Sequence, residues 1–197
     1  MEINEIEILS VGVDVGSSTS HLVFSNLLLK RDERSVSRRF LIQERNVIYE
    51  GRIINTPFLD NKTIDIDTLT GFLKEEYKRA GIDPEDIQTG AVIVTGETAR
   101  KDNARQIVEA LSNDAGKFVA ATAGPNFESL IAAMGSGATT RSKKHHKTIL
   151  SCDIGGGTSN IAISKVGVIL STSCISVGSI LLGVNPEGKI WRIDEPA

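Results

Sequence analysis

The chain has 197 residues, of which 40% are hydrophobic and 24% are charged, as is ordinary for a globular protein. The net charge of −3 and the aromatic content of 5% argue against a nucleic-acid-binding surface, which needs clustered basic residues and usually stacking rings. No apolar run approaches the roughly 20 residues that cross a bilayer, and the acidic N-terminus lacks the basic start of a signal peptide. We therefore expect neither nucleic acid nor a membrane as a partner.

The first half of the chain predicts strands followed by a helix. Strand-like runs cover residues 8–15, 20–29, 39–43 and 47–54. The last two runs predict a hairpin that turns at the residues between them. From Asp65 the apolar spacing changes to the helical period, with Ile66, Leu69, Leu73 and Tyr77 on one face and Gly81 as the stop.

The second half predicts a buried strand at 91–95, a helix near 101–112, a strand at 117–121 and a helix at 124–135. Residues 136–147 are small, polar and basic, which is typical of a linker. After them the pattern indicates a strand, a glycine loop, a hairpin that turns at Val166 and Gly167, and one short edge strand.

This organisation predicts two domains. The first covers residues 1–140, and the second begins at 148 and extends to 197. Only about fifty residues follow the linker, near the lower limit for a domain that folds alone, so we expect the second domain to be truncated. The two cysteines, Cys152 and Cys174, lie in strand-like runs without CxxC spacing, which favours buried, reduced thiols of a cytosolic protein over a disulfide.

Two short stretches repeat each other. "VDVGSST" at 13–19 and "CDIGGGT" at 152–158 each place an Asp before a Gly and a Thr, between two apolar runs. When Asp14 is aligned with Asp153, the hydrophobic alternation of the flanking runs also agrees. A strand–loop–strand unit that occurs twice indicates two related halves.

The residue types of these loops suit a phosphate group. Glycines remove Cβ atoms from the path of an anion and let backbone N–H groups converge on it, and hydroxyls add donors. The candidate phosphate-binding residues are Gly16, Ser17, Ser18, Thr19, Gly155, Gly156, Gly157 and Thr158. A carboxylate beside a phosphate needs a cation between them, so Asp14 and Asp153 are the candidate catalytic and Mg²⁺-binding residues.

A single loop of this kind is most often only a turn, because Asp and Gly are common turn residues for local reasons. Two copies in register favour the phosphate-binding interpretation.

These stretches resemble the superfamily of actin, heat-shock chaperone and sugar-kinase ATPases. The resemblance implies an α/β fold with a ribonuclease-H-like domain of mixed sheet and flanking helices, plus a truncated second domain of the same type. It also implies that ATP and Mg²⁺ lie between the two loops. "TAGPNFESLIAAMG" at 122–135 resembles the segment that connects the two domains.

A narrower resemblance is to the ethanolamine ammonia-lyase reactivating factors of the EutA type, carried by "VGVDVGSSTSHLVFS", "VTGETARKDNARQIVEALS", "FVAATAGPNFESLIAAMGSGA" and "LSCDIGGGTSNIAI". It implies an ATP-dependent, chaperone-like switch with weak ATPase activity. Such a factor acts on the adenosylcobalamin-dependent lyase and releases damaged cobalamin. The implied location is cytoplasmic, including association with a bacterial microcompartment.

The chain departs from the family pattern in two places. We find no adenosine-binding glycine motif, so the base-binding half of the site should be missing. Gly124 stands before Pro125 where the chaperones have a water-positioning Glu, and Glu97 or Glu128 could take that role. The alternatives are a sugar or metabolite kinase, an actin-like scaffold that binds nucleotide to control assembly, or a structural protein without nucleotide. The open sheet edge of a truncated domain would also favour a homo-oligomer.

Overall fold

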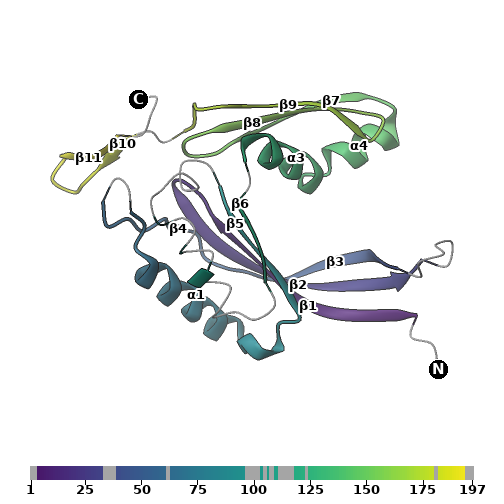
Figure 1. Ribbon diagram of the computed structural model, residues 1–197, viewed down its shortest axis with the longest axis horizontal. Helices are drawn as coiled ribbons and strands as arrows, with labels where there is room; N and C mark the ends of the chain where they lie inside the picture. Colours follow the sequence, from purple (N-terminus) through teal and green to yellow (C-terminus); the bar gives the residue numbers. More distant parts are fainter. Residues whose placement is uncertain are drawn as a thin grey trace.

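Two β-sheets organise the chain, and each is built on a hairpin that carries one of the two glycine loops (Figure 1). The computed structural model describes residues 4–32, 39–60, 63–95, 103, 106, 109–110, 118–122, 124–179 and 182–193. In the first sheet the strand order is β3-β2-β1-β5-β6, with β4 paired to β2 beside this path. Its strands are β1 (Glu5–Val15), β2 (Thr19–Arg31), β3 (Phe40–Glu50), β4 (Ile54–Asn55), β5 (Thr89–Val94) and β6 (Phe118–Thr122).

Helix α1 (Ile66–Ala80) packs on one face of the first sheet and closes the main core. The Asp65 side chain caps its N-terminus by accepting a hydrogen bond from Thr68 N at 3.0 Å, and Gly81 ends it in the left-handed conformation with φ 67°. The side chains that meet in the core are Val11, Val13, Val15, Leu22 and Phe24 from the strands and Leu69, Phe72, Leu73 and Tyr77 from the helix. Each is less than 9% exposed, so each such side chain contributes about 1.5–3 kcal/mol by leaving water.

The predicted hairpin over 39–43 and 47–54 is wrong, because β3 runs as one strand from Phe40 to Glu50. The expected turn residues, 44–46, pair with residues 26–28 of β2 and continue the antiparallel ladder. Two β-bulges, at Gln43 and Ile48, interrupt the register instead. Because the long strand β2 supplies hydrogen-bond partners along β3, the local preference of residues 44–46 for a turn is overridden.

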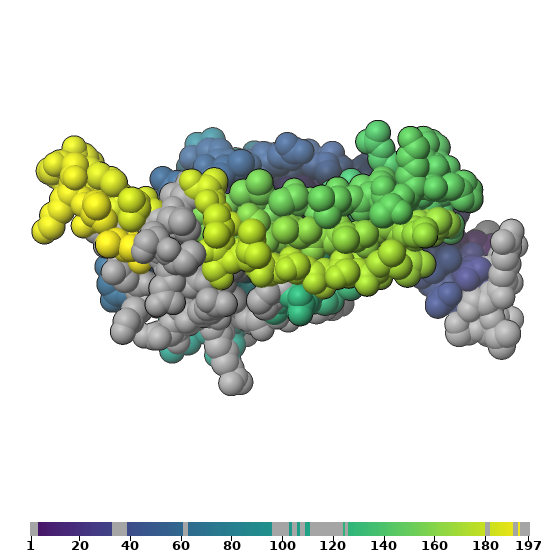
Figure 2. Space-filling model, turned by 90° about the horizontal axis from the view of Figure 1, so that it is seen from above, coloured from purple at the N-terminus to yellow at the C-terminus, as the bar shows by residue number. Residues whose placement is uncertain are grey.

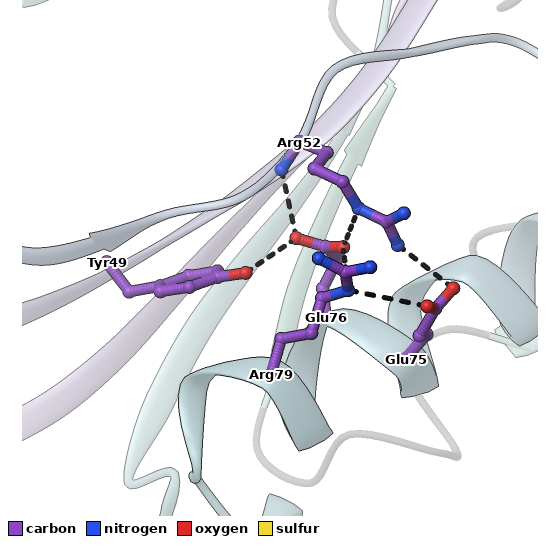
Figure 3. Close-up of polar contacts among 5 residues, drawn as sticks. All are labelled: Tyr49, Arg52, Glu75, Glu76 and Arg79. Atoms are coloured by element: carbon purple, nitrogen blue, oxygen red, sulfur yellow. Dashed lines mark hydrogen bonds and ion pairs between the residues drawn. The ribbon is translucent and has the colours of Figure 1, made fainter.

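A buried charge cluster ties the segment after β3 to α1 (Figure 3). Glu76 is fully buried and accepts hydrogen bonds from Tyr49 Oη at 2.8 Å, Arg52 N at 2.9 Å and Arg52 Nε at 2.6 Å. Arg52 also pairs with Glu75 at 2.9 Å, and Arg79 lies 3.3 Å from Glu75. Burial acts to raise the pKa of Glu76, but the bonds from Arg52 and Tyr49 outweigh it and hold that pKa below its ordinary value. The cluster thus fixes the start of the segment that leads to the first glycine loop.

The second sheet has the order β7-β8-β9 and is antiparallel throughout. Its strands are β7 (Thr148–Ile154), β8 (Ser159–Lys165) and β9 (Val168–Ile175), and helices α3 (Pro125–Gly135) and α4 (Ala138–His145) pack against it. Both helices lie on the side of the sheet that faces the first sheet (Figure 1). The turn between β8 and β9 is the predicted one, with positive φ at Val166 and Gly167.

The linker prediction for 136–147 is wrong, because most of that stretch forms α4. Ala138 and Ser142 are buried against the sheet, and Gly167 N donates to Ser142 Oγ at 2.8 Å. The small residues that suggested a flexible linker are the buried face of a helix, and the basic residues are its exposed face. Since α3 and α4 pack on the second sheet, we propose that the second unit begins at α3 rather than at residue 148.

Three smaller features complete the description. The short helix η1 (Pro84–Asp86) follows Asp83 as expected. The C-terminal stretch holds two strands, β10 (Leu182–Val184) and β11 (Ile190–Ile193), that pair with each other, where one edge strand was expected. The helix expected near 101–112 lies largely outside the described residues. Within that range the structure describes residues 103, 106, 109 and 110, and the last three are helical. In the part of the chain that the structure describes, no helix is long and apolar enough to span a membrane.

The expectation of buried cysteines is also wrong. Neither cysteine is in a disulfide, but Cys152 is exposed and Cys174 is half-buried. Cys152 points to the face of the second sheet opposite α3 and α4, and that face carries large exposed apolar residues.

Candidate functional site

The two glycine loops occupy equivalent places in two equivalent hairpins. In the first hairpin Asp14 pairs with His21 across β1 and β2, and in the second Asp153 pairs with Asn160 across β7 and β8. The spacing between the two copies is the same, 139 residues, for both partners (153 − 14 and 160 − 21). The internal repeat seen in the sequence is therefore a repeat of backbone pairing as well.

The loops also share their internal hydrogen bond. Gly16 N donates to the carbonyl oxygen of Thr19 at 3.0 Å, and Gly155 N donates to that of Thr158 at 2.8 Å. The same donor and acceptor positions close both loops into tight turns. Thr158 is buried, whereas Thr19 is exposed, so the hydroxyls of the two loops differ in their access to solvent.

Each loop is braced by a hydroxyl residue from a later segment. Thr56 Oγ1 donates to the carbonyl oxygen of Gly16 at 2.7 Å, and Thr56 N donates to that of Ser18 at 2.9 Å. In the second loop Ser179 donates to the carbonyl oxygen of Gly155 through its N at 3.0 Å and its Oγ at 3.2 Å. These bonds satisfy the carbonyls of Gly16, Ser18 and Gly155.

The two loops touch each other. A Cβ atom added at Gly156 would lie 1.6 Å from Ser18 Oγ and 2.5 Å from Ser18 Cβ. Gly178 passes equally close to the second loop, because a Cβ there would lie 2.2 Å from the carbonyl oxygen of Gly156. Within the described part of the chain, Ser18 Oγ is buried and has no hydrogen-bond partner. The contact therefore depends on glycine at both positions.

Asp153 lies near enough to Asp14 to affect the ionisation of Asp14. Burial raises the pKa of the Asp14 carboxyl above its ordinary value, the charge of His21 and a hydrogen bond from Thr95 lower it, and the negative charge of Asp153 raises it. The raising effects prevail, so ionised Asp14 is penalised in this arrangement. A cation between the two carboxylates would reverse that penalty. Among the described residues no group of three or more potential metal-ligating side chains forms.

A cavity of about 490 Å³ lies beside Asp153. Its lining residues are Ala132, Gly135, Ser136, Ser151, Cys152, Asp153 and Asn160. Neither Asp14 nor a loop glycine lines it, so this cavity lies next to the paired loops and not between them. In this arrangement Ser18 and Gly156 lie against each other.

The structure brings the predicted residues of both loops together, and it adds others that sequence reasoning missed. Thr56 and Ser179 brace the loops, Thr95 contacts Asp14, and Gly178 permits the close approach. Thr56 follows Gly16 by 40 residues and Ser179 follows Gly155 by 24 (56 − 16 and 179 − 155). Because these separations differ, the repeat alone could not identify them. Glu97 lies outside the described residues, and Glu128 lies in the first turn of α3.

Solved structures share this fold. The chain is similar to the PPX-GPPA enzyme of Aquifex aeolicus, with a TM-score of 0.57 and 18% sequence identity over 88% of this chain and 54% of that one. It is also similar to an exopolyphosphatase from Cytophaga hutchinsonii, with a TM-score of 0.52 and 14% identity over 86% of this chain and 51% of that one. The predicted fold class, an α/β architecture with a mixed sheet, is confirmed, because these solved structures share it.

Relatives in sequence are closer. The chain is 39% identical over 194 residues to the ethanolamine ammonia-lyase reactivase EutA of Escherichia coli and 38% identical to that of Salmonella typhimurium. Each match covers 98% of this chain and 42% of the relative, so the chain spans less than half the length of these relatives. The family model described as ethanolamine utilisation protein EutA matches residues 6–197. The chain therefore belongs to the EutA family of ethanolamine utilisation proteins.

Proposed function

We propose that the paired loops bind the phosphates of ATP and that Asp14 and Asp153 hold Mg²⁺ through its water molecules. One observation carries this proposal: two equivalent hairpins bring their glycine loops into contact, with Asp14 and Asp153 at equivalent positions beside them. Burial, with a smaller contribution from the charge of Asp153, raises the pKa of Asp14 and so the cost of ionising it. A bound divalent cation would remove that cost and would also neutralise a phosphate between the loops.

Each residue type has a distinct part in this site. The N–H groups of Gly16 and Gly155 close the two loops, so it is the N–H groups of the other loop residues that donate to phosphate oxygens, and the hydroxyls of Ser17, Ser18 and Thr19 add donors. Thr56 and Ser179 hold the loops in shape through the carbonyls that face away. Mg²⁺, when bound, supplies the positive charge that lets carboxylates and phosphates share one site.

Nucleotide binding would be coupled to movement. The loops are in contact at Ser18 and Gly156, so phosphates can enter only when the two sheets move apart, and bound nucleotide would favour the separated state. A difference in spacing between the two sheets is the kind of change that a partner protein can detect. This property favours a switch over a metabolic enzyme.

We propose ethanolamine ammonia-lyase as the partner of the whole protein. The support is membership of the EutA family and the name of the relatives, which are reactivases of that lyase. In this proposal the nucleotide-dependent movement promotes release of damaged adenosylcobalamin from the lyase. We further propose a cytoplasmic location with association to a bacterial microcompartment.

The first test is calorimetric titration with ATP and Mg²⁺. Because the chain spans 42% of its relatives, the protein to use is a hybrid in which this chain replaces the matching part of the Escherichia coli relative. We expect Asp14→Ala and Asp153→Ala each to weaken binding by about tenfold or more, as loss of a charged contact does. Asp83→Ala is the matched control, since Asp83 makes no capping hydrogen bond through its side chain. Folded Asp variants that bind like the unchanged hybrid would refute the nucleotide site.

The second test is reactivation of the lyase. Lyase inactivated with a damaged cobalamin is incubated with the hybrid, ATP, Mg²⁺, intact cofactor and ethanolamine, and ammonia release from ethanolamine is followed. Recovery that depends on ATP and on Asp14 supports the proposed partner. Nucleotide binding without recovery would leave the site standing and overturn the partner.

The two rival functions give different results. A sugar or metabolite kinase would transfer phosphate to a member of a substrate panel, and an actin-like scaffold would sediment when ATP is added. Neither activity is expected of the hybrid.

A further inference from the structure

Residues 51–56, which we call the bracing segment, join the charge cluster on α1 to the first glycine loop. At one end the Glu76 carboxylate accepts hydrogen bonds from Arg52 N at 2.9 Å and from Arg52 Nε at 2.6 Å (Figure 3). At the other end Thr56 donates to two loop carbonyl oxygens, at 2.7 Å through Oγ1 and at 2.9 Å through N. One short segment therefore carries both a charged anchor and the donors that brace the loop.

The bracing segment is also held between its two ends. Gly51 N donates to the carbonyl oxygen of Leu22 at 2.9 Å, and a Cβ atom at Gly51 would lie 2.8 Å from that oxygen and 3.1 Å from Glu76 Oε2. Strand β4 then pairs with Thr19 and Ser20 at the start of β2. Because the segment is bonded to β2 at successive points, a displacement at Glu76 would pass along it to the loop.

Both anchors of the bracing segment are buried. Glu76 and Thr56 are 0% and 5% exposed, and the fully buried Ser20 places its Oγ 2.9 Å from Thr56 Oγ1. A buried ion pair gives little net stability compared with packed apolar side chains. What the carboxylate offers instead is geometry, because it holds Arg52 N and Arg52 Nε at once and so fixes the main chain together with the side chain.

The second loop is braced without a charged anchor. It belongs to the other layer of the molecule, whose strands β7, β8 and β9 form much of the surface that Figure 2 shows. Ser179 reaches the carbonyl oxygen of Gly155 shortly after β9 ends at Ile175, and residues 176–179 carry no charged side chain. A change at Glu76 should therefore act on the first loop and spare the second.

We propose that Glu76 is a positioning residue for the first glycine loop. Its carboxylate holds the start of the bracing segment, and the segment holds the loop carbonyls. The loop N–H groups then keep the arrangement in which they can donate to a phosphate. Glu76 acts through Arg52 and Thr56 and does not itself contact the nucleotide. Only the effect on nucleotide binding rests on the proposed function.

Amide hydrogen exchange of the 197-residue chain measures the coupling without a nucleotide. The Thr56 and Gly16 amides report on the first loop, and the Gly155 amide reports on the second. In Glu76→Gln the first two should exchange about tenfold or more faster, because a charge-assisted anchor is weakened, and the third should change by less than about twofold. A cluster that only joins α1 to the sheet would accelerate all three alike or none of them, and either result overturns the proposal.

Glu75→Gln is the matched control. Glu75 pairs with Arg52 Nη2 at 2.9 Å at the exposed side of the cluster, and its loss leaves both bonds from Arg52 to Glu76 in place. It should leave the exchange rates of both loops unchanged. If Glu76→Gln does not fold, Arg52→Lys is measured in its place, because it keeps the charge but loses the guanidinium geometry. It should accelerate exchange in the first loop only, and equal rates in both loops would count against Glu76.

Nucleotide binding by the hybrid gives a second readout, at a temperature at which every variant stays folded. Glu76→Gln and Thr56→Val should each weaken binding of ATP and Mg²⁺ by about threefold to tenfold, and the double variant should bind no worse than the weaker single one, because both changes release the same segment. Ser179→Ala acts on the other loop, so its effect should multiply with that of Glu76→Gln. Effects of Glu76→Gln and Thr56→Val that multiply would overturn the coupling. If the unchanged hybrid binds no ATP, the proposed function fails, and the exchange rates alone decide the role of Glu76.

Discussion

A methyl group at Gly156 should force the two glycine loops apart. The Cβ atom of Gly156→Ala would lie 1.6 Å from Ser18 Oγ and 2.5 Å from Ser18 Cβ. Ordinary contacts between such atoms are about 3.5–4.0 Å, so even with Ser18 Oγ rotated away the loops would have to move by about 1–1.5 Å to clear Ser18 Cβ. Rotation of the Ser18 side chain cannot relieve the overlap, because its Cβ atom does not move when the side chain rotates. We expect a loss of about 1–3 kcal/mol in the free energy of unfolding, the usual cost of overpacking.

A double-mutant cycle isolates this contact. With Ser18→Gly the nearest remaining atom of residue 18 is its Cα, at 3.5 Å from the new methyl group. Ser18 Oγ has no hydrogen-bond partner in the described part of the chain, so its removal should cost little by itself. The double variant should therefore recover most of the stability, with a coupling energy of about 1–2 kcal/mol.

The assay is urea denaturation of the 197-residue chain, followed by circular dichroism. Gly155→Ala is the matched control, because its Cβ would lie 3.4 Å from the carbonyl oxygen of Thr158, an ordinary contact. If Gly156→Ala is as stable as Gly155→Ala, or if Ser18→Gly gives no recovery, the two loops do not lie against each other and the argument for a shared site fails.

Three further changes test the surroundings of the site. Burial raises the pKa of Asp14, so ionisation of Asp14 above that pKa lowers the stability of the folded chain. Asp14→Asn should therefore stabilise the metal-free chain at pH 7 by about 0.5–2 kcal/mol. A melting temperature below that of the unchanged chain would contradict this. Glu76→Gln should lower the free energy of unfolding by about 1.5–3 kcal/mol, because it weakens charge-assisted hydrogen bonds to a fully buried carboxylate. Glu75→Gln, at a half-exposed site, should lower it by less than about 1 kcal/mol. The folded-state pKa of Glu76 lies below its ordinary value of 4.5. Its contribution to the free energy of unfolding should therefore be present above pH 4.5 and disappear as the pH falls through the folded-state pKa. Urea titrations at several pH values would refute this if the Glu76 and Glu75 variants behaved alike. Thr56→Val should cost about 1–3 kcal/mol by leaving the carbonyl of the first loop without its donor, and Thr56→Ser, which keeps the hydroxyl, should preserve most of the stability in the same titration.

The presence and the residue content of the two equivalent loops could be predicted from local sequence. Asp14 and Asp153 each end a strand, the glycines and threonines follow at the same spacing, and the flanking runs alternate in both copies. These are short-range patterns, and the turn geometry they predict depends on neighbouring residues only. The helix from Ile66 to Ala80 could be predicted for the same reason, because its cap at Asp65 and its stop at Gly81 are local signals.

Long-range pairing was not predictable in the same way. The turn expected at residues 44–46 is absent because β2 continues beside them and supplies hydrogen-bond partners. The linker expected at 136–147 forms α4 because the second sheet offers a face on which Ala138 and Ser142 can be buried. In both cases a distant strand decides the conformation, and it leaves no mark within the segment itself.

The sequence by itself determined that two equivalent loops exist, which residues they carry and which family the chain resembles. Only the tertiary structure decided that Ser18 meets Gly156, that Thr56 and Ser179 brace the loops, and that Cys152 is exposed. The physical reason is the range of the interactions. Turn and helix propensities act over a few residues, whereas close approach, bracing and burial depend on side chains that the chain brings together from tens of residues or more away.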